Sequence, residues 1–341
     1  MSESSEIFSK KQLITIGVIF VVVVVVGLIL IFSAPYYAFY STSSTIRTIF
    51  KYITYLGEPI VFIVIVAIFF IAYDKRFAKN LALSLLFSTY VNELVKDIFM
   101  DPRPTLTNVD PDLISPQNPG GLIETSYGFP SGHTQSAVAF WGYFAYNFRK
   151  RLYIPIILGV VIFLVSISRL IVGVHDLQDV IGGFAIGVIV VMLFIYLEPH
   201  GTKLFNALKL PLKLVLVIVV SLALFLVGIF LFPTSGTDLL PAPVAFSDTG
   251  GFAQVGGVFL GFGIAYVLEG EYVKYDPSKL DWKWRIINLV IGLVILFAIY
   301  FGLEAIKAVF DSVFYRFARY AIIGFILGFI LPLIFVKIHK V

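Results

Sequence analysis

Two histidines in this sequence stand among residues that could transfer a phosphoryl group. His175 precedes Asp179 by four residues, so the two side chains share a face if a helix has begun there. A carboxylate beside one imidazole nitrogen fixes the tautomer and leaves the other nitrogen free to attack phosphorus. His133 follows a Pro-Ser-Gly tripeptide and has no carboxylate in its own motif. We therefore interpret His133 as the group that protonates a leaving oxygen and then activates water.

Cations and a helix start lie close to these histidines in the sequence. Lys96, Arg103 and Arg169 supply fixed positive charge. An arginine fork can bind two phosphate oxygens, and a lysine acts as a point charge. Ser131 and Gly132 stand where a helix should begin, and the first backbone N–H groups of a helix bind anions. Such a site requires no metal ion or other cofactor, and the chain has no cysteine for a thiolate metal site.

Membrane-spanning helices must position these groups. Of the 341 residues, 59% are hydrophobic and only 13% are charged, compared with about 25% charged in soluble domains. Apolar runs of roughly 20 residues, the length that crosses the hydrocarbon core, recur from end to end. The sequence predicts an all-α, polytopic membrane bundle of about ten transmembrane helices. The expected spans are residues 12–33, 57–74, 79–100, 131–149, 152–170, 177–197, 209–232, 249–268, 284–306 and 318–337.

A break at residues 198–211 divides these spans into two blocks. Residues 1–200 are predicted to form a six-span core that carries the motifs of residues 96–179. Residues 201–341 are predicted to add a four-span block whose role the sequence does not indicate. Its small residues would permit close helix packing, so a homodimer through the C-terminal helices is one expectation.

The distribution of Lys and Arg predicts the orientation in the membrane. Most of the 25 basic residues fall in loops on the side of the N-terminus, which the positive-inside rule assigns to the cytoplasm. Both termini are then cytoplasmic, and the motif residues face the outside or a lumen. The basic residues form no stripe, and the formal net charge is only +4, so nucleic-acid binding is not expected.

The ordered motifs resemble those of the type 2 phosphatidic acid phosphatase superfamily, over roughly residues 57–197. They read Lys96-x6-Arg103-Pro104, Pro130-Ser131-Gly132-His133 and Ser168-Arg169-x5-His175-x3-Asp179. The resemblance implies a metal-independent phosphatase that works through a phosphohistidine. It implies that His175 is the nucleophile, Asp179 its partner and His133 the general acid. The phosphate would be held by Lys96, Arg103, Ser131, Gly132 and Arg169.

Several functions remain open at this stage. A site level with the lipid head groups favours a phosphorylated membrane lipid, either a monoester or an isoprenoid diphosphate. The same fold could instead hydrolyse a soluble sugar phosphate or pass the phosphoryl group to an acceptor alcohol. A transporter whose intramembrane charges form an ion path is the alternative that is not an enzyme. Each cation alone could be an interfacial anchor, but anchors do not predict the ordered spacing of three motifs.

Overall fold

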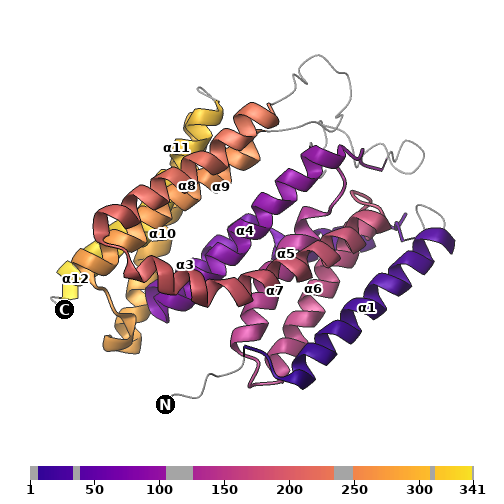
Figure 1. Cartoon of the computed structure of the whole chain (residues 1–341), viewed down its shortest axis with the longest axis horizontal. Coiled ribbons are helices and arrows are strands. Elements are labelled where there is room, and N and C mark those ends of the chain that lie inside the picture. Colours follow the sequence, from indigo (N-terminus) through magenta and orange to yellow (C-terminus); the bar gives the residue numbers. More distant parts are fainter. Residues whose placement is uncertain (1–6, 34–38, 105–125, 234–248, 308–311, 340–341) are drawn as a thin grey trace. The chain divides into compact units, whose positions relative to one another are not determined.

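The computed structural model has a helix at each of the ten expected spans (Figure 1). It describes residues 7–33, 39–104, 126–233, 249–307 and 312–339, and within these ranges all regular structure is helical. Seven of the helical segments are individually long and apolar enough to cross a membrane, and a broken segment, Ser44–Gly57 with Pro59–Ala72, could be an eighth. The predicted all-α membrane architecture is confirmed.

The two helices that carry the first and second motifs are not among the segments that are individually long and apolar enough to cross a membrane. α4 (Lys75–Phe99) has 25 residues but buries several polar side chains, and α5 (Gly132–Asn147) has only 16 residues. The buried polar residues of α4 are Asn80, Ser84, Ser88, Asn92, Lys96 and Asp97. Polar side chains inside a membrane protein are costly, so their concentration on α4 marks it as a functional helix.

The described chain divides into two compact units. The first unit comprises Met1–Glu58 and Phe87–His200, and the second comprises Pro59–Leu86, Gly201–Ser235 and Ser247–Val341, in each case for the described residues. One division between the units falls after His200, and the domain boundary expected there stays a prediction. Residues 59–86, however, group with the C-terminal helices, whereas the sequence placed them in the N-terminal core.

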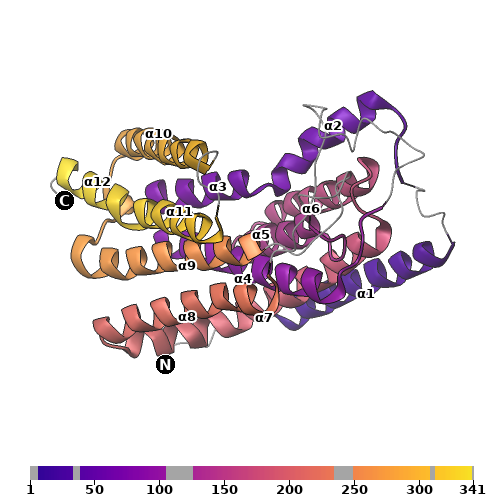
Figure 2. The same cartoon turned by 90° about the horizontal axis from the view of Figure 1, so that it is seen from above.

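The first unit contains the predicted catalytic motifs. Its elements are α1 (Lys10–Ser33), α2 (Ser44–Thr54), the 3-10 turn η1 (Tyr55–Gly57), the second half of α4, α5, α6 (Tyr153–Ile171) and the greater part of α7 (Leu177–Ala207). α6 packs against both α5 and α2 (Figure 2). α7 lies so close to α5 that a side chain at Gly183 would collide with the backbone of Ser131. This close approach brings the start of α7 beside the start of α5.

The second unit is built around α9 (Thr249–Leu268), which lies between α8 (Leu210–Leu231) and α11 (Val313–Phe325) (Figure 2). A side chain at Gly261 would collide with the carbonyl group of Ala321 on α11. The glycines of α9 thus serve packing within the chain, as small residues do between membrane helices. The expected homodimer through these helices stays a prediction. The remaining elements are α3 (Pro59–Ala72), the start of α4, η3 (Glu269–Val273), η4 (Pro277–Lys279), α10 (Trp282–Lys307), η5 (Ile326–Ile330) and α12 (Leu331–His339).

A buried polar network joins the connection after α9 to other elements of the second unit. Glu269 is 1% exposed, and its carboxylate accepts a 2.6 Å hydrogen bond from the ammonium group of Lys75. The backbone N–H of Tyr275 donates to the same carboxylate, and the Tyr275 hydroxyl donates to the carbonyl of Ile71. A buried carboxylate requires such partners, so this network stabilises the connection.

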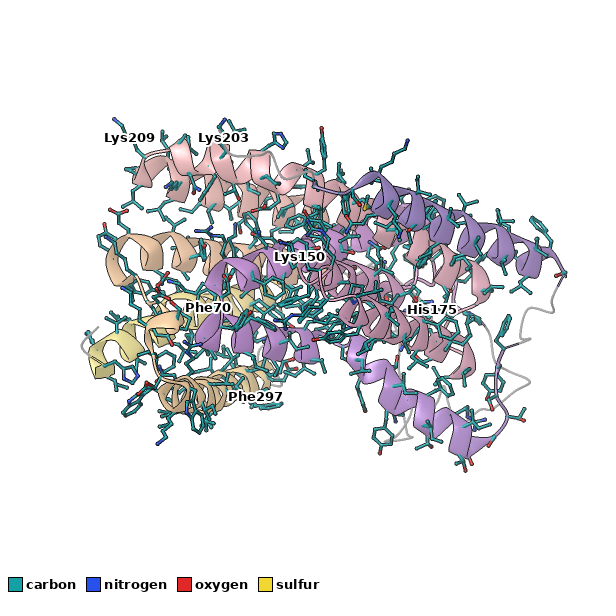
Figure 3. All side chains as sticks on the ribbon, turned by 90° about the horizontal axis from the view of Figure 1, so that it is seen from below. Phe70, Lys150, His175, Lys203, Lys209 and Phe297 are labelled. Atoms are coloured by element: carbon teal, nitrogen blue, oxygen red, sulfur yellow. The ribbon has the colours of Figure 1, made fainter. Side chains whose placement is uncertain are left out.

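Apolar side chains project outward from the long helices (Figure 3). On α1, Val18, Val22 and Ile29 are each more than half exposed, which suits a lipid-facing helix. Lys203 and Lys209, near the end of α7 and the start of α8, project away from the ribbon (Figure 3). The sequence assigned both lysines to the cytoplasmic side.

Candidate active site

The first motif spans the end of α4. Lys96 lies in the last turn of the helix and is 5% exposed. Met100 follows the last helical residue with a positive φ of 50°, and its N–H donates to the Lys96 carbonyl. Pro102 and Pro104 prevent the helix from continuing. Arg103 therefore lies outside the helix, which ends at Phe99.

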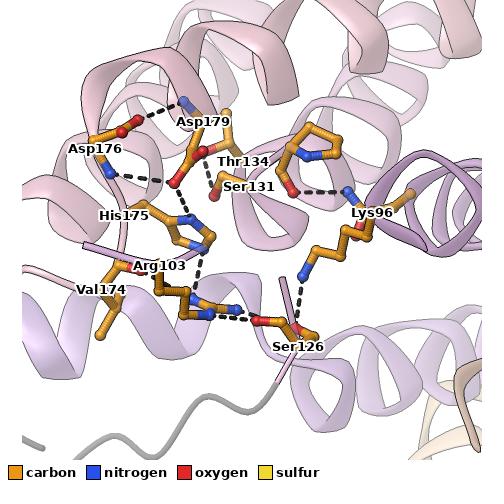
Figure 4. A network of polar contacts seen from close by, with 11 residues as sticks. Lys96, Arg103, Ser126, Ser131, Thr134, Val174, His175, Asp176 and Asp179 are labelled. Atoms are coloured by element: carbon orange, nitrogen blue, oxygen red, sulfur yellow. Dashed lines mark hydrogen bonds and ion pairs between the residues drawn. The ribbon is translucent and has the colours of Figure 1, made fainter. Parts of the chain in front are cut away.

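Lys96 and Arg103 converge on Ser126 (Figure 4). The Lys96 ammonium donates to the Ser126 hydroxyl oxygen over 2.7 Å, and Nη2 of Arg103 donates to the same oxygen over 3.0 Å. Nε of Arg103 also donates to the Ser126 carbonyl oxygen over 2.6 Å. The hydroxyl oxygen therefore lies where two cations could bind a phosphate oxygen. The sequence offered no signal for Ser126 beyond its place before the second motif.

The third motif begins at the end of α6, which closes in a Schellman motif. The N–H of Gly173 donates to the carbonyl of Leu170, and the N–H of Val174 donates to the carbonyl of Arg169. Gly173 has a φ of 80°, the left-handed conformation that this motif requires and that glycine adopts readily. This tight reversal explains part of the spacing between Arg169 and His175.

A capping box at the start of α7 explains the rest of that spacing. The carboxylate of Asp176 accepts a hydrogen bond from the N–H of Asp179, and the carboxylate of Asp179 accepts one from the N–H of Asp176. These reciprocal bonds satisfy two N–H groups at the helix start and fix the Asp179 side chain. Sequence reasoning overlooked Asp176, although an acidic pair at this spacing before an apolar run is a helix-start signal.

The His175 ring lies between Asp179 and Arg103 (Figure 4). Nδ1 is 2.9 Å from Oδ2 of Asp179, and Nε2 is 3.1 Å from Nη1 of Arg103. Guanidinium nitrogens only donate, so Nε2 must accept and Nδ1 must carry the proton. The geometry thus selects the tautomer whose Nε2 lone pair could attack phosphorus. The predicted pairing of His175 with Asp179 is present.

The surroundings of His175 keep its ring neutral. The side chain is 1% exposed and lies in the turn between α6 and α7. Burial lowers the pKa of His175 well below its usual value of 6.5, and the positive charges of Arg103, Arg169 and Lys96 lower it further. A neutral imidazole is the form that acts as a nucleophile.

The second motif forms the start of α5. Ser131 is the N-cap residue and is fully buried; its N–H donates to the carbonyl of Asp179, and its hydroxyl accepts from Thr134. The first N–H groups of a helix, which belong to Gly132 and His133, have no carbonyl partner within the helix. A side chain built on Gly132 would lie 3.9 Å from the Lys96 ammonium, so this helix start faces a cation. The predicted phosphate contacts of Ser131 and Gly132 stay predictions.

Buried amide groups hold α4 against α5. The Asn92 amide donates to the carbonyl of Pro130 and to the Gln135 side-chain oxygen, over 3.2 and 2.9 Å. The Gln135 amide in turn donates to the carbonyl of Ser88 over 2.8 Å. All three side chains are nearly inaccessible, so the network fixes the first motif relative to the second. Asn92 makes the helix–helix hydrogen bond expected of a polar residue within a span.

The segment after α2 contacts two of the predicted site residues. Arg169 is fully buried, and its Nη1 donates to the Thr54 hydroxyl over 2.9 Å. Nε2 of His133 lies 3.0 Å from Oε1 of Glu58. His133 thus has a carboxylate partner, which its own motif does not contain. Sequence reasoning missed Thr54 and Glu58, because both lie far from the motifs along the chain.

The motifs fall within a region that matches a known family. Residues 77–203 match the PAP2 superfamily, and residues 253–340 match the transmembrane extension of PAP2 superfamily phosphatases. Phosphatidylglycerophosphatase B of Bacillus subtilis is 31% identical over 156 residues, which cover 41% of this chain and 70% of that protein. The chain belongs to the PAP2 superfamily. The resemblance inferred from the three motifs is confirmed, and this PAP2 protein is a multi-pass membrane phosphatase.

Other similar proteins share a smaller part of their length with this PAP2 phosphatase. Mouse sphingosine-1-phosphate phosphatase 2 is 28% identical over 42% of this chain and 40% of its own. Lipid phosphate phosphatase delta of Arabidopsis thaliana is 27% identical over 35% and 30%. The chain spans less than half the length of these two relatives.

Two solved structures also resemble the chain. LpxE of Aquifex aeolicus has a TM-score of 0.38 and 27% identity, over 45% of this chain and 87% of that one. The first transmembrane PAP2-type phosphatidylglycerolphosphate phosphatase from Bacillus subtilis has a TM-score of 0.38 and 20% identity, over 55% and 96%.

Proposed function

We propose that this PAP2 phosphatase removes phosphate from a phosphorylated lipid through a phosphohistidine on His175, without a metal ion, at the outer face of the membrane. The observation that carries the proposal is the position of the His175 ring. Nδ1–H donates a hydrogen bond to Asp179, and Nε2 accepts one from Arg103, which fixes the lone pair on Nε2. Nε2 is the atom that would attack phosphorus.

The first step forms the phosphoenzyme. The lone pair of Nε2 forms a bond to phosphorus while the bond from phosphorus to the lipid oxygen breaks. His133 donates a proton to that oxygen, and the lipid alcohol leaves. Lys96, Arg103 and Arg169 neutralise the charge on the phosphoryl oxygens, as cations do in phosphoryl transfer. Arg103 would exchange its contact with Nε2 for a contact with the phosphate.

The second step returns the enzyme to its starting state. Water attacks phosphorus, the bond from phosphorus to Nε2 breaks, and its electron pair returns to the ring. His133 accepts the proton that the water loses, and inorganic phosphate leaves. Asp179 stabilises the positive charge that His175 acquires in the intermediate.

The substrate class follows from the membrane setting and from the relatives. The similar proteins are named as phosphatases of phosphatidylglycerophosphate, of lipid phosphates and of sphingosine-1-phosphate. All of these are lipids with a terminal phosphate. A lipid monoester is therefore the proposed substrate, and an isoprenoid diphosphate remains within the same class.

A panel of substrates tests the proposal. Purified protein in EDTA should release phosphate from phosphatidic acid, phosphatidylglycerol phosphate, a sphingoid phosphate or an isoprenoid diphosphate. His175→Ala should abolish this release, because it removes the proposed nucleophile. Preference for glucose 6-phosphate would shift the function to sugar phosphates. Loss of activity in EDTA would refute the metal-free mechanism, and no release from any substrate would favour the transporter.

A further inference from the structure

The segment 54–58, which includes the last residue of α2 and the turn after it, supplies a carboxylate to the second motif. We propose that Glu58 is a positioning residue that holds the Nε2 proton of His133 and thereby prepares Nδ1 to transfer a proton. This role rests on the proposed phosphatase function of the site. It completes a pair of carboxylate–imidazole contacts, with Asp179 serving His175 and Glu58 serving His133.

The contact between Glu58 and His133 is short and partly shielded. Oε1 of Glu58 lies 3.0 Å from Nε2 of His133, and the side chains are 28% and 17% exposed. Both residues belong to the first unit. A carboxylate at this distance accepts the Nε2–H hydrogen bond and favours the protonated imidazole.

Three further contacts fix the backbone that presents Glu58. The Thr54 hydroxyl accepts from buried Arg169, and the Leu56 carbonyl accepts from the indole N–H of Trp141 over 3.2 Å. A Cβ atom at Gly57 would lie 2.9 Å from Cγ1 of Val165 and 3.2 Å from Cδ2 of His133, so this backbone lies close to both side chains. The segment thus contacts α6 through Arg169 and α5 through Trp141 and His133. Such support is what keeps a reacting group in place.

The charges around His133 make a carboxylate necessary. Lys96 from α4, Arg103 after α4 and Arg169 from α6 bring positive charge to the site, and His175 from the α6–α7 turn is electrostatically coupled to His133. Positive charge disfavours a protonated imidazole in its vicinity, and a neighbouring carboxylate favours it. A general acid must nevertheless hold its proton when the substrate arrives. Glu58, at 3.0 Å from Nε2, offsets this repulsion.

The contact with Glu58 gives the two nitrogens of His133 different roles in proton transfer. Nε2 keeps its proton in the hydrogen bond to Glu58 throughout the reaction. Nδ1 gives its proton to the leaving oxygen in the first step and takes one from water in the second. Proton balance is maintained, because His133 is protonated before the first step and again after the second.

Replacing Glu58 with Gln tests this role by pH dependence and by choice of leaving group. Glu58→Gln keeps the size of the side chain but removes its charge. We expect kcat for phosphatidylglycerol phosphate to fall about 10- to 100-fold, less than the roughly 10²- to 10⁴-fold that a general acid–base group itself contributes. The alkaline limb of the kcat/KM profile should move to lower pH, because His133 loses its proton more easily. p-Nitrophenyl phosphate, whose leaving group needs no proton, should lose much less activity.

Matched variants separate this role from a structural one. Glu271→Gln replaces an exposed glutamate of the second unit and should leave every parameter unchanged. Glu58→Asp restores the charge and should recover part of the lost activity. In a His133→Ala background, Glu58→Gln should cost nothing further. Equal losses for both substrates, or an unchanged alkaline limb in a folded Glu58→Gln variant, would overturn the proposal.

A titration without turnover distinguishes failure of this proposal from failure of the proposed function. Nitrogen NMR of histidine-labelled protein should show His133 losing its proton at lower pH in Glu58→Gln than in the unmodified protein. This shift is expected even if no tested substrate releases phosphate, in which case only the proposed function fails. The same midpoint in both proteins would refute the pairing, whatever the enzyme assays show.

Discussion

At the scale of single residues, the site contains a nucleophile whose tautomer is fixed by its neighbours. The cations around this nucleophile disfavour its protonation. His175 donates from Nδ1 to Asp179 and accepts at Nε2 from Arg103. The sequence predicted the pair of His175 and Asp179 from helical spacing alone. It could not predict that Arg103 contacts the same ring, because that contact depends on how the chain turns after α4.

Replacing Asp179 with Asn should disable the nucleophile while preserving its shape. The amide can present its N–H₂ group to Nδ1, which would place the ring proton on Nε2 and remove the attacking lone pair. We expect kcat to fall about a thousandfold or more, as for the equivalent change in catalytic triads. Steady-state phosphate release measures this. Retention of more than a tenth of the activity would show that Asp179 does not select the tautomer.

His175 should remain neutral below the usual range of histidine titration. Its pKa is lowered by burial and by the neighbouring cations, so protonation requires a pH well below 6.5. As the pH falls through 6.5, the ring should therefore stay neutral and competent for attack. Nitrogen NMR of the unliganded protein, with His175→Asn to assign the signal, measures the midpoint. A midpoint at or above 6.5 would contradict the inferred environment.

Ser126 should compete with phosphate for two cations. Its hydroxyl accepts from Lys96 and Arg103, so phosphate must displace these contacts in order to bind. Ser126→Ala should lower the inhibition constant of inorganic phosphate by about fivefold, the equivalent of roughly 1 kcal/mol for one hydrogen bond. Ser166→Ala, whose hydroxyl bonds only within α6, is the control and should have no effect. Weaker phosphate binding by Ser126→Ala would mean that this hydroxyl helps to hold the ligand.

At the scale of elements, two helix ends determine the geometry of the third motif. The Schellman motif at Gly173 ends α6, and the capping box of Asp176 and Asp179 begins α7. Local signals of this kind are readable from sequence, because glycine and acidic residues satisfy the unpaired groups of helix ends. The contact of segment 54–58 with α5 and α6 was not readable, because it depends on tertiary packing between distant parts of the chain.

Removing the Asp176 side chain should loosen this connection. Asp176→Ala removes an N-cap acceptor, which typically costs about 1 kcal/mol of stability. We expect a lower Tm and a severalfold lower kcat, since Asp179 would be held less firmly. Asp176→Asn keeps the acceptor oxygen and should behave almost like the unmodified protein. Equal effects of the two substitutions would indicate that the charge, rather than the cap, is what matters.

At the scale of the whole molecule, the places of the helices were predictable, because apolar length indicates most of them. About ten transmembrane helices were expected, and seven described helical segments, or eight with the broken one, are long and apolar enough to cross a membrane. Every expected span contains a helix, including α4 and α5, whose polar side chains lower their hydropathy. The grouping of the helices into two units is harder to predict from the sequence. Residues 59–86 group with the C-terminal helices, which depends on contacts that no periodicity reveals.

The packing of α9 should tolerate no enlargement at Gly261. A methyl group there collides with the Ala321 carbonyl, so Gly261→Ala should destabilise the protein by about 1–3 kcal/mol. Gly302 on α10 has open space around it, and Gly302→Ala should be neutral or slightly stabilising. Thermal unfolding in detergent compares the two variants. Equal Tm values would contradict the close contact of α9 with α11.

The predicted orientation can be tested by cysteine labelling, since the chain contains no cysteine of its own. Ser44 is exposed at the start of α2, close to Ser41, whose N–H donates to the carbonyl of Ile171 at the end of α6. Lys150 is exposed in the connection between α5 and α6. A membrane-impermeant thiol reagent applied to intact cells should label Ser44→Cys but not Lys150→Cys. The reverse pattern would place the site on the cytoplasmic side.

Trapping the phosphoenzyme tests directly whether His175 is the nucleophile. Protein mixed with phosphatidylglycerol phosphate labelled in its terminal phosphate is quenched within one turnover, and the labelled residue is located by mass spectrometry. We expect an acid-labile, alkali-stable phosphate on His175 that is absent from His175→Ala. Phosphate on another residue, or full turnover by His175→Ala, would contradict it.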